Sequence, residues 1–421
     1  MRIGYACLTK GIRNTDFRSC KKNNATDEKL LSIIESNLDS LKNILEYNGK
    51  NNIRLFRISS DIIPFGSSPV NKLPWWNIYK DRFDELGKII KSTGQRVSMH
   101  PGQYTVINSP RDDVVQRAIE DLEYHCRVLD CLETGPENKI VLHVGGVYGN
   151  KPEAVKYFIK NYYKLSESAK ERLVIENDDK SYTISDVLEI SEQTGIPVVF
   201  DNLHHEINKR DLEDGYSQYY WISKAENTWK TADGNQKIHY SQQNKSKKAG
   251  SHSDTILINE FIDFYKKLQK DKPDIMLEVK DKNISALKCV NILSKEKNIR
   301  FLEEEWARYK YNVLEHDGAD YQKIRDLLKD KNKYPVFEFY NLIDSALEKS
   351  LIINNQYNSA LHVWGYFSDV CENTEKMKMS RLFDEFLVGK KDIRHVKNQL
   401  QKFAVKYRDE YLLSSYYFDV V

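Results

Sequence analysis

The sequence predicts an α/β protein, a (β/α)₈ TIM barrel with a C-terminal α-helical domain. Short apolar runs alternate with longer segments of helical spacing through roughly the first 280 residues, which is the pattern of repeated β and α units. Beyond that point the strand-like runs stop and aromatic-rich helical segments follow. Eight apolar runs favour a closed barrel, although periodicity alone also allows an open doubly wound sheet.

The expected strands are short, as buried parallel strands often are, and amphipathic helices are expected between them. One such helix covers residues 27–47, with Thr26 placed as its cap. Others cover 112–132 and 184–194, and Gly195 supplies a left-handed stop for the latter. The eight strands are expected at residues 2–4, 53–58, 96–99, 139–142, 173–175, 197–200, 237–240 and 275–277.

The composition fits a globular protein with two domains. The chain has 421 residues, of which 40% are hydrophobic and 30% charged, and its formal net charge is +2. This length suits a barrel plus a second module, so we expect a barrel domain over 1–295 and a helical domain over 300–421. A chain so close to neutral would hold a polyanion only through a local basic patch.

Cysteine usage and hydropathy indicate a cytoplasmic protein with no membrane partner. The six cysteines are scattered and include no Cys-x-x-Cys pair, which argues for reduced thiols and against a zinc ribbon or disulfide framework. No run approaches the roughly 18 apolar residues of a membrane span. The opening residues MRIGYACLTK lead directly into a strand, without a signal-type apolar region.

Metal-ligating side chains close most of the expected strands. In such a barrel the C-terminal ends of the strands surround the active site, so these residues would share one rim. Any one of them alone is more often a hydrogen-bonded structural residue, but five of the ten histidines fall on this rim. The residues are His100, His143, Glu176, Asp201, His204, Lys237, His239 and Glu278, with His252 in the loop after strand seven.

Crowded imidazoles and carboxylates are costly to bury unless cations lie among them. Mixed ligands of these two kinds suit Mn²⁺, Zn²⁺ or Fe²⁺ better than Mg²⁺ or Ca²⁺. We expect a cluster of two or three divalent ions, with Mn²⁺ as the first choice and Glu176 as a bridging ligand. Such a cluster would activate water and neutralise phosphate, which phosphodiester cleavage requires. On extended backbone, His205 would point away from His204 and support the site indirectly.

Nine short motifs run through roughly the first 285 residues. They are GYACLT, FRISSDIIPFGSSP, RVSMHPGQYTVINSP, VLHVGGVYGNK, IENDDKSYT, VVFDNLHHEIN, KIHYS, AGSHSD and MLEVKDK. In order and spacing they resemble the UV damage endonuclease family, relatives of endonuclease IV. The resemblance implies a metal-dependent barrel nuclease that nicks damaged double-stranded DNA immediately 5′ of a photolesion, leaving a 3′-hydroxyl and a 5′-phosphate. The metal ligands it implies are His100, His143, Glu176, Asp201, His204, His239, His252 and Glu278.

The resemblance also implies roles in DNA recognition and catalysis. Gln103 and Tyr104 match the pair with which the family probes a damaged duplex, and an amide beside an aromatic ring can wedge into a weakened base stack. Tyr5 matches a family position near the lesion. Lys237 lies two residues before His239 on the same strand face, so it is expected to join Glu176 in catalysis, as a modified ligand or a phosphate contact.

Three lysines follow strand seven, in the loop QQNKSKKAGSH. Lys245, Lys247 and Lys248 would be a solvated charge run on most loops, but beside a phosphate-cleaving rim they are candidates for contacts with the DNA backbone. One departure from the family concerns Ser68, since many members carry histidine at this position. The departure puts full occupancy of the metal cluster in doubt.

The C-terminal stretches NSALHVWGYFSDV and YRDEYLLSSYYFD resemble the YbgA-type domain of unknown function, which implies no chemistry. His362, Trp364 and Tyr366 could form a surface for nucleic acid or a partner protein, but packing in a helical core is the favoured interpretation.

Two other functions stay open at the level of sequence. One is a metal-dependent sugar isomerase or epimerase, because related barrels carry similar rims. This function predicts a closed pocket for a small polyol and assigns no role to Gln103 and Tyr104. The other is a catalytically weak protein that binds lesions, in which the missing imidazole at Ser68 has disabled cleavage.

Overall fold

The computed structural model describes residues 1–211, 213–269 and 271–418. These residues divide into two compact units. Unit 1 contains residues 1–9, 13–256 and 263–287, and unit 2 contains residues 10–12, 257–262 and 288–421. The domain limits expected from the sequence, 1–295 and 300–421, stay a prediction. Among the described residues, no helix is both long and apolar enough to cross a membrane.

Unit 1 is built on eight parallel strands in the order β3-β2-β1-β8-β7-β6-β5-β4. A parallel bridge between Met99 and Ile140 joins the two ends of this order and nearly closes the barrel. The predicted (β/α)₈ class is therefore confirmed, and the open doubly wound sheet is excluded. The strands are β1 Ile3–Ala6, β2 Leu55–Arg57, β3 Arg96–Ser98, β4 Ile140–His143, β5 Leu173–Glu176, β6 Val198–Asp201, β7 Lys237–Tyr240 and β8 Asp274–Leu277.

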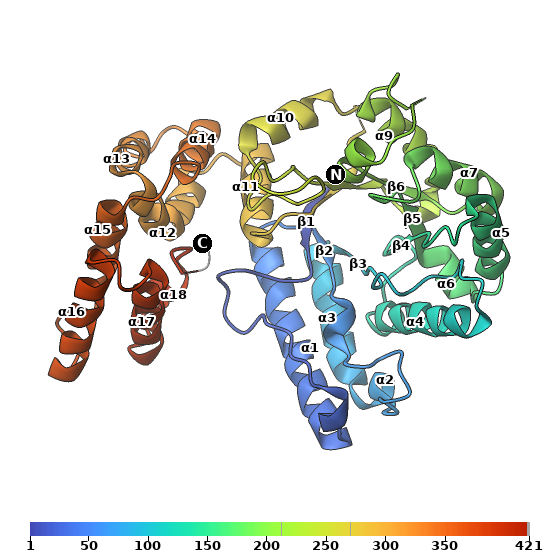
Figure 1. Cartoon of the computed structure of the whole chain (residues 1–421), viewed down its shortest axis with the longest axis horizontal. Coiled ribbons are helices and arrows are strands. Elements are labelled where there is room, and N and C mark those ends of the chain that lie inside the picture. Colours follow the sequence, from blue (N-terminus) through green and yellow to red (C-terminus); the bar gives the residue numbers. More distant parts are fainter. Residues whose placement is uncertain (212, 270, 419–421) are drawn as a thin grey trace. The chain divides into compact units, whose positions relative to one another are not determined.

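Helices lie outside the strands, as Figure 1 shows for α3, α4, α5 and α7. Thr26 caps α1 as predicted, since its side chain accepts a hydrogen bond from the Lys29 amide. Gly195 ends α7 in the left-handed region, with φ 75°. The helices of the barrel sequence are α1 Asp27–Lys50, α2 Trp75–Ile78, α3 Lys80–Thr93, α4 Asp112–Cys131, α5 Lys151–Tyr162, α6 Glu167–Arg172, α7 Ile184–Thr194, α8 Asn202–Ile207, α9 Gln218–Glu226, α10 Ile258–Lys267 and α11 Asn283–Leu293.

The strand ends differ from the predicted ones in a way that concerns the site. β4, β5 and β6 each run one residue further than expected and end on His143, Glu176 and Asp201. His204 and His205 both lie on α8, so the condition of extended backbone, under which His205 would point away from His204, is not met. The Asp201 carboxylate begins this helix by accepting a hydrogen bond from the His204 amide, which turns the chain as soon as β6 ends.

The described part of unit 2 is helical, with a core of aromatic and aliphatic side chains that includes Phe367, Phe383, Leu400 and Phe403. Aromatic residues therefore supply much of the apolar contact in this unit, as its sequence suggested. Its helices are α12 Ile299–His316, α13 Gly318–Leu327, α14 Val336–Leu347, α15 Ile353–Trp364, α16 Asn373–Leu387, α17 Ile393–Lys406 and α18 Glu410–Leu413.

A buried ion pair fixes the N-terminal side of the barrel. Arg96 on β3 and Asp274 on β8 are almost fully buried, and Arg96 Nη1 lies 3.0 Å from Asp274 Oδ2. Arg96 also donates to the carbonyls of Glu137 and Asp233, and the Arg2 amide donates to Asp274 Oδ1. The pair thus connects two strands that are separated by β2 and β1 in the sheet order.

We expect Asp274→Asn to lower the free energy of unfolding by about 3 kcal/mol, because it leaves the Arg96 charge buried without its partner. Urea denaturation followed by tryptophan fluorescence measures the change. Asp84→Asn is the matched control, because the Lys80–Asp84 pair is exposed and should contribute less than about 1 kcal/mol. Equal shifts for both variants would contradict the assignment.

Candidate metal centre

Glu176 stands at the centre of a group of imidazoles and carboxylates at the C-terminal ends of the strands. Its Oε1 lies 2.7 Å from His239 Nδ1 and 3.6 Å from His204 Nδ1, and its Oε2 lies 3.4 Å from His100 Nε2 and 4.0 Å from His143 Nε2. One buried carboxylate thus contacts side chains from four other parts of the barrel.

Parallel register explains why residues distant in sequence meet here. His143 on β4 pairs with Glu176 on β5, and Asp201 on β6 pairs with His239 on β7. Since these strands all point the same way, their last residues reach the same end of the barrel. Glu278 follows β8, and its Oε1 lies 3.4 Å from His239 Nδ1.

Among the residues that the structure describes, two groups of side chains have a spacing that could hold a metal ion. One group is His100, His143 and Glu176, and the other is Glu176, Asp201 and His239. In each group the ligand atoms lie within 4.8 Å of one another. Glu176 belongs to both groups, as a bridging ligand between two ions would.

Buried polar atoms that have no hydrogen-bond partner indicate whether a cation would fit this centre. Within the described residues, Glu176 Oε2, Asp201 Oδ2 and His143 Nδ1 are buried without a hydrogen-bond partner. Glu176 is 1% exposed and Asp201 is fully buried, so the lack of partners would be costly in a protein with nothing bound there. Divalent cations would satisfy these oxygens and nitrogens, and the residues therefore fit a metal centre.

Hydrogen bonds to backbone carbonyls orient two of the imidazoles. His100 Nδ1 lies 3.0 Å from the carbonyl oxygen of Pro101, and His204 Nδ1 lies 3.0 Å from that of Asn177. Such bonds hold Nδ1 protonated and leave Nε2 as the basic nitrogen, which is a common arrangement for metal-ligating histidine.

The electrostatics favour the ionised form of Glu176 and the neutral forms of His143, His239 and His252. Burial raises the pKa of the Glu176 carboxyl, but the surrounding imidazoles, led by His239, lower it well below its ordinary value. Burial lowers the pKa of His239 to about 4, and it also lowers the pKa of His143 and of His252. Neutral imidazole and ionised carboxylate are the states that bind metal ions.

Asp201 and His204 behave as a coupled pair. Burial, reinforced by the charge of Glu176, raises the pKa of Asp201 to about 7. Burial would lower the pKa of His204, but Asp201 and Glu176 outweigh it and raise the value to about 9. Without a cation the proton is thus shared between these two groups, and a bound cation would displace it.

Lys237 is buried at the start of β7, and His252 reaches the centre from the loop after that strand. Lys237 is 1% exposed, and its Nζ finds no hydrogen-bond partner among the described residues. Burial lowers the pKa of this amine well below its ordinary value, and nearby Arg57 adds to the effect. His252 enters from the loop after β7, where it pairs with Gln243, and its Nε2 lies 3.9 Å from Glu278 Oε2.

Arg57, the last residue of β2, is a member of the centre that the sequence analysis missed. Its Nη2 lies 2.5 Å from Glu278 Oε1 and 3.0 Å from His239 Nε2. Arginine is not a metal ligand, so the pattern of ligand residues at the strand ends does not include it. Arg57 also lies inside the expected strand 53–58 and is a terminal residue only in the shorter observed strand β2.

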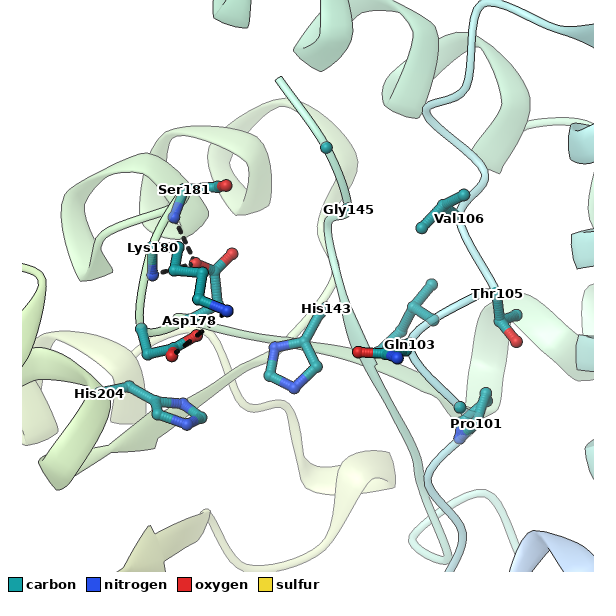
Figure 2. Close-up of a pocket in the computed structure, with 14 residues that line it drawn as sticks. Pro101, Gln103, Thr105, Val106, His143, Gly145, Asp178, Lys180, Ser181 and His204 are labelled. Carbon is teal, nitrogen blue, oxygen red and sulfur yellow. Dashed lines mark hydrogen bonds and ion pairs between the residues drawn. The ribbon is translucent and has the colours of Figure 1, made fainter. Parts of the chain in front are cut away.

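A pocket opens beside the candidate ligands (Figure 2). His143 and His204 line it together with Gln103, and Gly145 borders it without a side chain. In Figure 2 the His143 ring lies between the side chains of His204 and Gln103. The neighbouring hollow shares the Gln103–Tyr104 loop and is also lined by Ser68.

Most of the residues predicted to contact DNA are exposed. Tyr104 is 84% exposed, and Gln103 beside it is also exposed. Lys245, Lys247 and Lys248 are exposed as well, on a loop whose ends are joined by the bridge from Gln243 to His252. The lysine loop is therefore tied to the strand that carries a candidate ligand.

Tyr5 and Ser68 both form hydrogen bonds within the protein. Tyr5 is fully buried on β1, and its hydroxyl lies 2.9 Å from Asn48 Oδ1 and 2.8 Å from Thr9 Oγ1. We therefore do not include Tyr5 among the proposed DNA contacts. Ser68 Oγ accepts a hydrogen bond from the Val70 amide within its own turn.

Comparison with known proteins identifies the family. A model of the UV-endonuclease UvdE family matches residues 1–310. A UV DNA damage endonuclease from Clostridium perfringens (strain 13 / Type A) is 46% identical over 392 residues, which cover 91% of this chain and 92% of that protein. The chain belongs to the UvdE family. The resemblance carried by the nine motifs is thereby confirmed.

Other UvdE relatives match mainly the barrel. A UV DNA damage endonuclease from Bacillus cereus (strain G9842) is 32% identical, over 71% of this chain and 96% of that protein. A crystal structure described as SacUVDE is 42% identical, with a TM-score of 0.66, and covers 70% of this chain and 98% of its own. A second family model, described as a protein of unknown function (DUF1722), matches residues 310–420.

We expect Arg57→Met to lower the free energy of unfolding of the metal-free protein by about 3 kcal/mol, because Glu278 would lose its buried partner. Chelator-treated protein is to be denatured in urea with and without the substitution. Arg82→Met is the control, since Arg82 pairs with Asp39 at the surface and should contribute less than about 1 kcal/mol. An Arg57 variant as stable as its control would show that this charge is not needed.

Proposed function

We propose that the protein is a metal-dependent DNA repair endonuclease that nicks the phosphodiester backbone immediately 5′ of UV photolesions in double-stranded DNA. Family membership supports the reaction class, since the relatives at 46% and 32% identity are both named UV DNA damage endonuclease. The observation that carries the proposal is the position of Glu176, which belongs to both candidate metal groups at the mouth of the barrel.

A cluster of two or three divalent ions, Mn²⁺ as the first choice, fits the donors. The proposed ligands are those of the family pattern, and they supply both imidazole nitrogen and carboxylate oxygen. Bound there, such ions would supply Lewis-acid activation of water and neutralise charge on a phosphodiester. The ligands are His100, His143, Glu176, Asp201, His204, His239, His252 and Glu278.

The chain's own residues would bind the phosphate, hold the ligands and exclude water. Lys237 offers a buried amine on the strand that carries His239, which suits either a modified ligand or a phosphate contact. Arg57 holds Glu278 and His239 in place through its guanidinium. The buried position of Glu176 limits access of bulk water to the carboxylate that joins the two groups.

Recognition of damage is proposed for the exposed loop after β3. Tyr104 can stack where a lesion has weakened base pairing, while Gln103 lines the pocket beside His143. Lys245, Lys247 and Lys248 would contact phosphates, so their contribution should fall with salt. An exposed ring on the rim suits a large substrate better than the closed polyol pocket of a sugar isomerase.

The cytoplasm is the proposed compartment. All six cysteines are free in the structure, which suits a reducing environment.

We expect Glu176→Gln to reduce nicking of UV-irradiated plasmid with Mn²⁺ by more than the roughly 10–100-fold that loss of an outer-shell partner causes. The neutral amide would lose the charge that both candidate metal groups share. Agarose electrophoresis of relaxed and supercoiled plasmid measures nicking. The control is Glu192→Gln on the exposed face of α7, which should retain full activity. Full nicking by the Glu176 variant would refute the proposed centre.

We expect Tyr104→Ala to weaken binding to lesion-containing duplex by about tenfold, because one stacking contact would be lost. Fluorescence anisotropy in a chelator measures binding without cleavage. Metal content, measured separately by mass spectrometry, should not change. Tyr163→Ala serves as control, because Tyr163 is 57% exposed next to α5 and has no proposed contact. Loss of affinity in both variants would argue against a specific role for Tyr104.

A further inference from the structure

Unit 2 contains a cluster of three tyrosines and one lysine that the proposed nuclease site does not use. Tyr311 and Lys310 come from α12, Tyr366 follows α15, and Tyr411 lies on α18. The rings of Tyr366 and Tyr411 are nearly parallel, at 20°, with centroids 5.8 Å apart. The Tyr311 hydroxyl donates to the Tyr366 hydroxyl at 2.9 Å. We call these four residues the tyrosine–lysine cluster.

The Lys310 ammonium contacts tyrosine rings instead of carboxylates. Its Nζ lies 4.6 Å from the ring centroid of Tyr311 and 4.8 Å from that of Tyr411, within the range of cation–π attraction. Within the described residues, this ammonium forms no ion pair with a carboxylate. Lys397 and Lys406 of the same unit differ in this respect, since they pair with Glu315 and Glu375.

One ring of the cluster faces solvent. Tyr366 is 42% exposed, whereas Tyr311 is only 5% exposed. The hydroxyl of Tyr411 donates to the Ala307 carbonyl at 3.2 Å, so the inner rings are fixed while the outer ring is accessible. Core packing, the favoured interpretation of the sequence, holds for Trp364, whose ring lies 5.8 Å from that of Phe403. It does not hold for Tyr366.

We propose that the tyrosine–lysine cluster binds single-stranded nucleic acid. An unpaired base would stack on the exposed ring of Tyr366, and the adjacent phosphate would pair with Lys310. A stacking surface beside a cation is the combination with which proteins hold single strands without sequence preference. An apolar peptide would cover the ring but leave the ammonium without an anion, whereas a nucleotide satisfies both.

This site is independent of the proposed nuclease activity. All four residues belong to unit 2, and none is a candidate metal ligand. Binding to an undamaged single strand requires neither a lesion nor a divalent ion. Failure of this proposal would therefore leave the nuclease proposal intact, and the reverse also holds.

The test uses the full-length protein in a chelator, with Tyr104→Ala as the background so that the barrel rim contributes no stacking. Fluorescein-labelled oligodeoxyuridine and oligouridine of about 12 nucleotides are titrated by anisotropy. We expect Tyr366→Ala to weaken binding about tenfold. Lys310→Gln should also weaken binding and reduce its dependence on salt. A preference for one of the two oligonucleotides would identify the sugar.

Three further variants distinguish a loss of base stacking from a general loss of folding. Tyr366→Phe keeps the ring and should bind within about twofold of the background. Phe337→Ala and Lys402→Gln remove an exposed ring and an exposed ammonium elsewhere in unit 2, and they should have no effect. The proposal is overturned if Tyr366→Ala and Lys310→Gln bind both oligonucleotides as well as these controls do.

Discussion

The arrangement of the barrel mouth depends on one buried carboxylate. Glu176 is 1% exposed and lies within 4.0 Å of four imidazoles. A carboxylate so deeply buried is stable only where positive charge or hydrogen-bond donors surround it. The imidazoles supply part of this requirement, but one of its oxygens finds no hydrogen bond among the described residues. A divalent cation would supply what is missing.

The same constraint explains the cationic side chains around the centre. Arg57 is buried and contacts Glu278, so part of the negative charge is balanced by the protein itself. Lys237 is buried as well, and burial lowers the pKa of its amine, which disfavours the charged form. The protein therefore provides a partial balance that leaves room for cations. A site fully neutralised by its own arginine and lysine residues would have less affinity for metal ions.

Unit 2 uses aromatic side chains in two ways. Most of its large rings, such as Phe367 and Phe403, fill the core, which is the ordinary role of such residues. Tyr366 differs because its ring contacts Tyr311 and Tyr411 while 42% of the residue remains exposed. Sequence composition cannot separate the two roles, since Trp364 and Tyr366 occur in the same motif and only one of them packs inward.

Much of this protein was determined by sequence alone. Alternating apolar runs predicted the eight strands, because buried parallel strands and amphipathic helices have different hydrophobic periods. Polar residues closing those runs predicted the rim, because parallel strands end on the same side of a barrel. The motifs predicted the family. Residue type and spacing carry this information directly.

Tertiary structure decided the remaining features of the site, because these depend on contacts between residues far apart in the chain. Arg57 joins the centre only because the order of the sheet brings β2 near β7 and β8. Tyr5 lies near the end of β1 and His143 at the end of β4, yet Tyr5 is buried and its hydroxyl contacts Asn48 and Thr9. His204 turns toward Glu176 because Asp201 starts a helix at that point. Burial and direction are properties of the packed fold, and local sequence does not encode them.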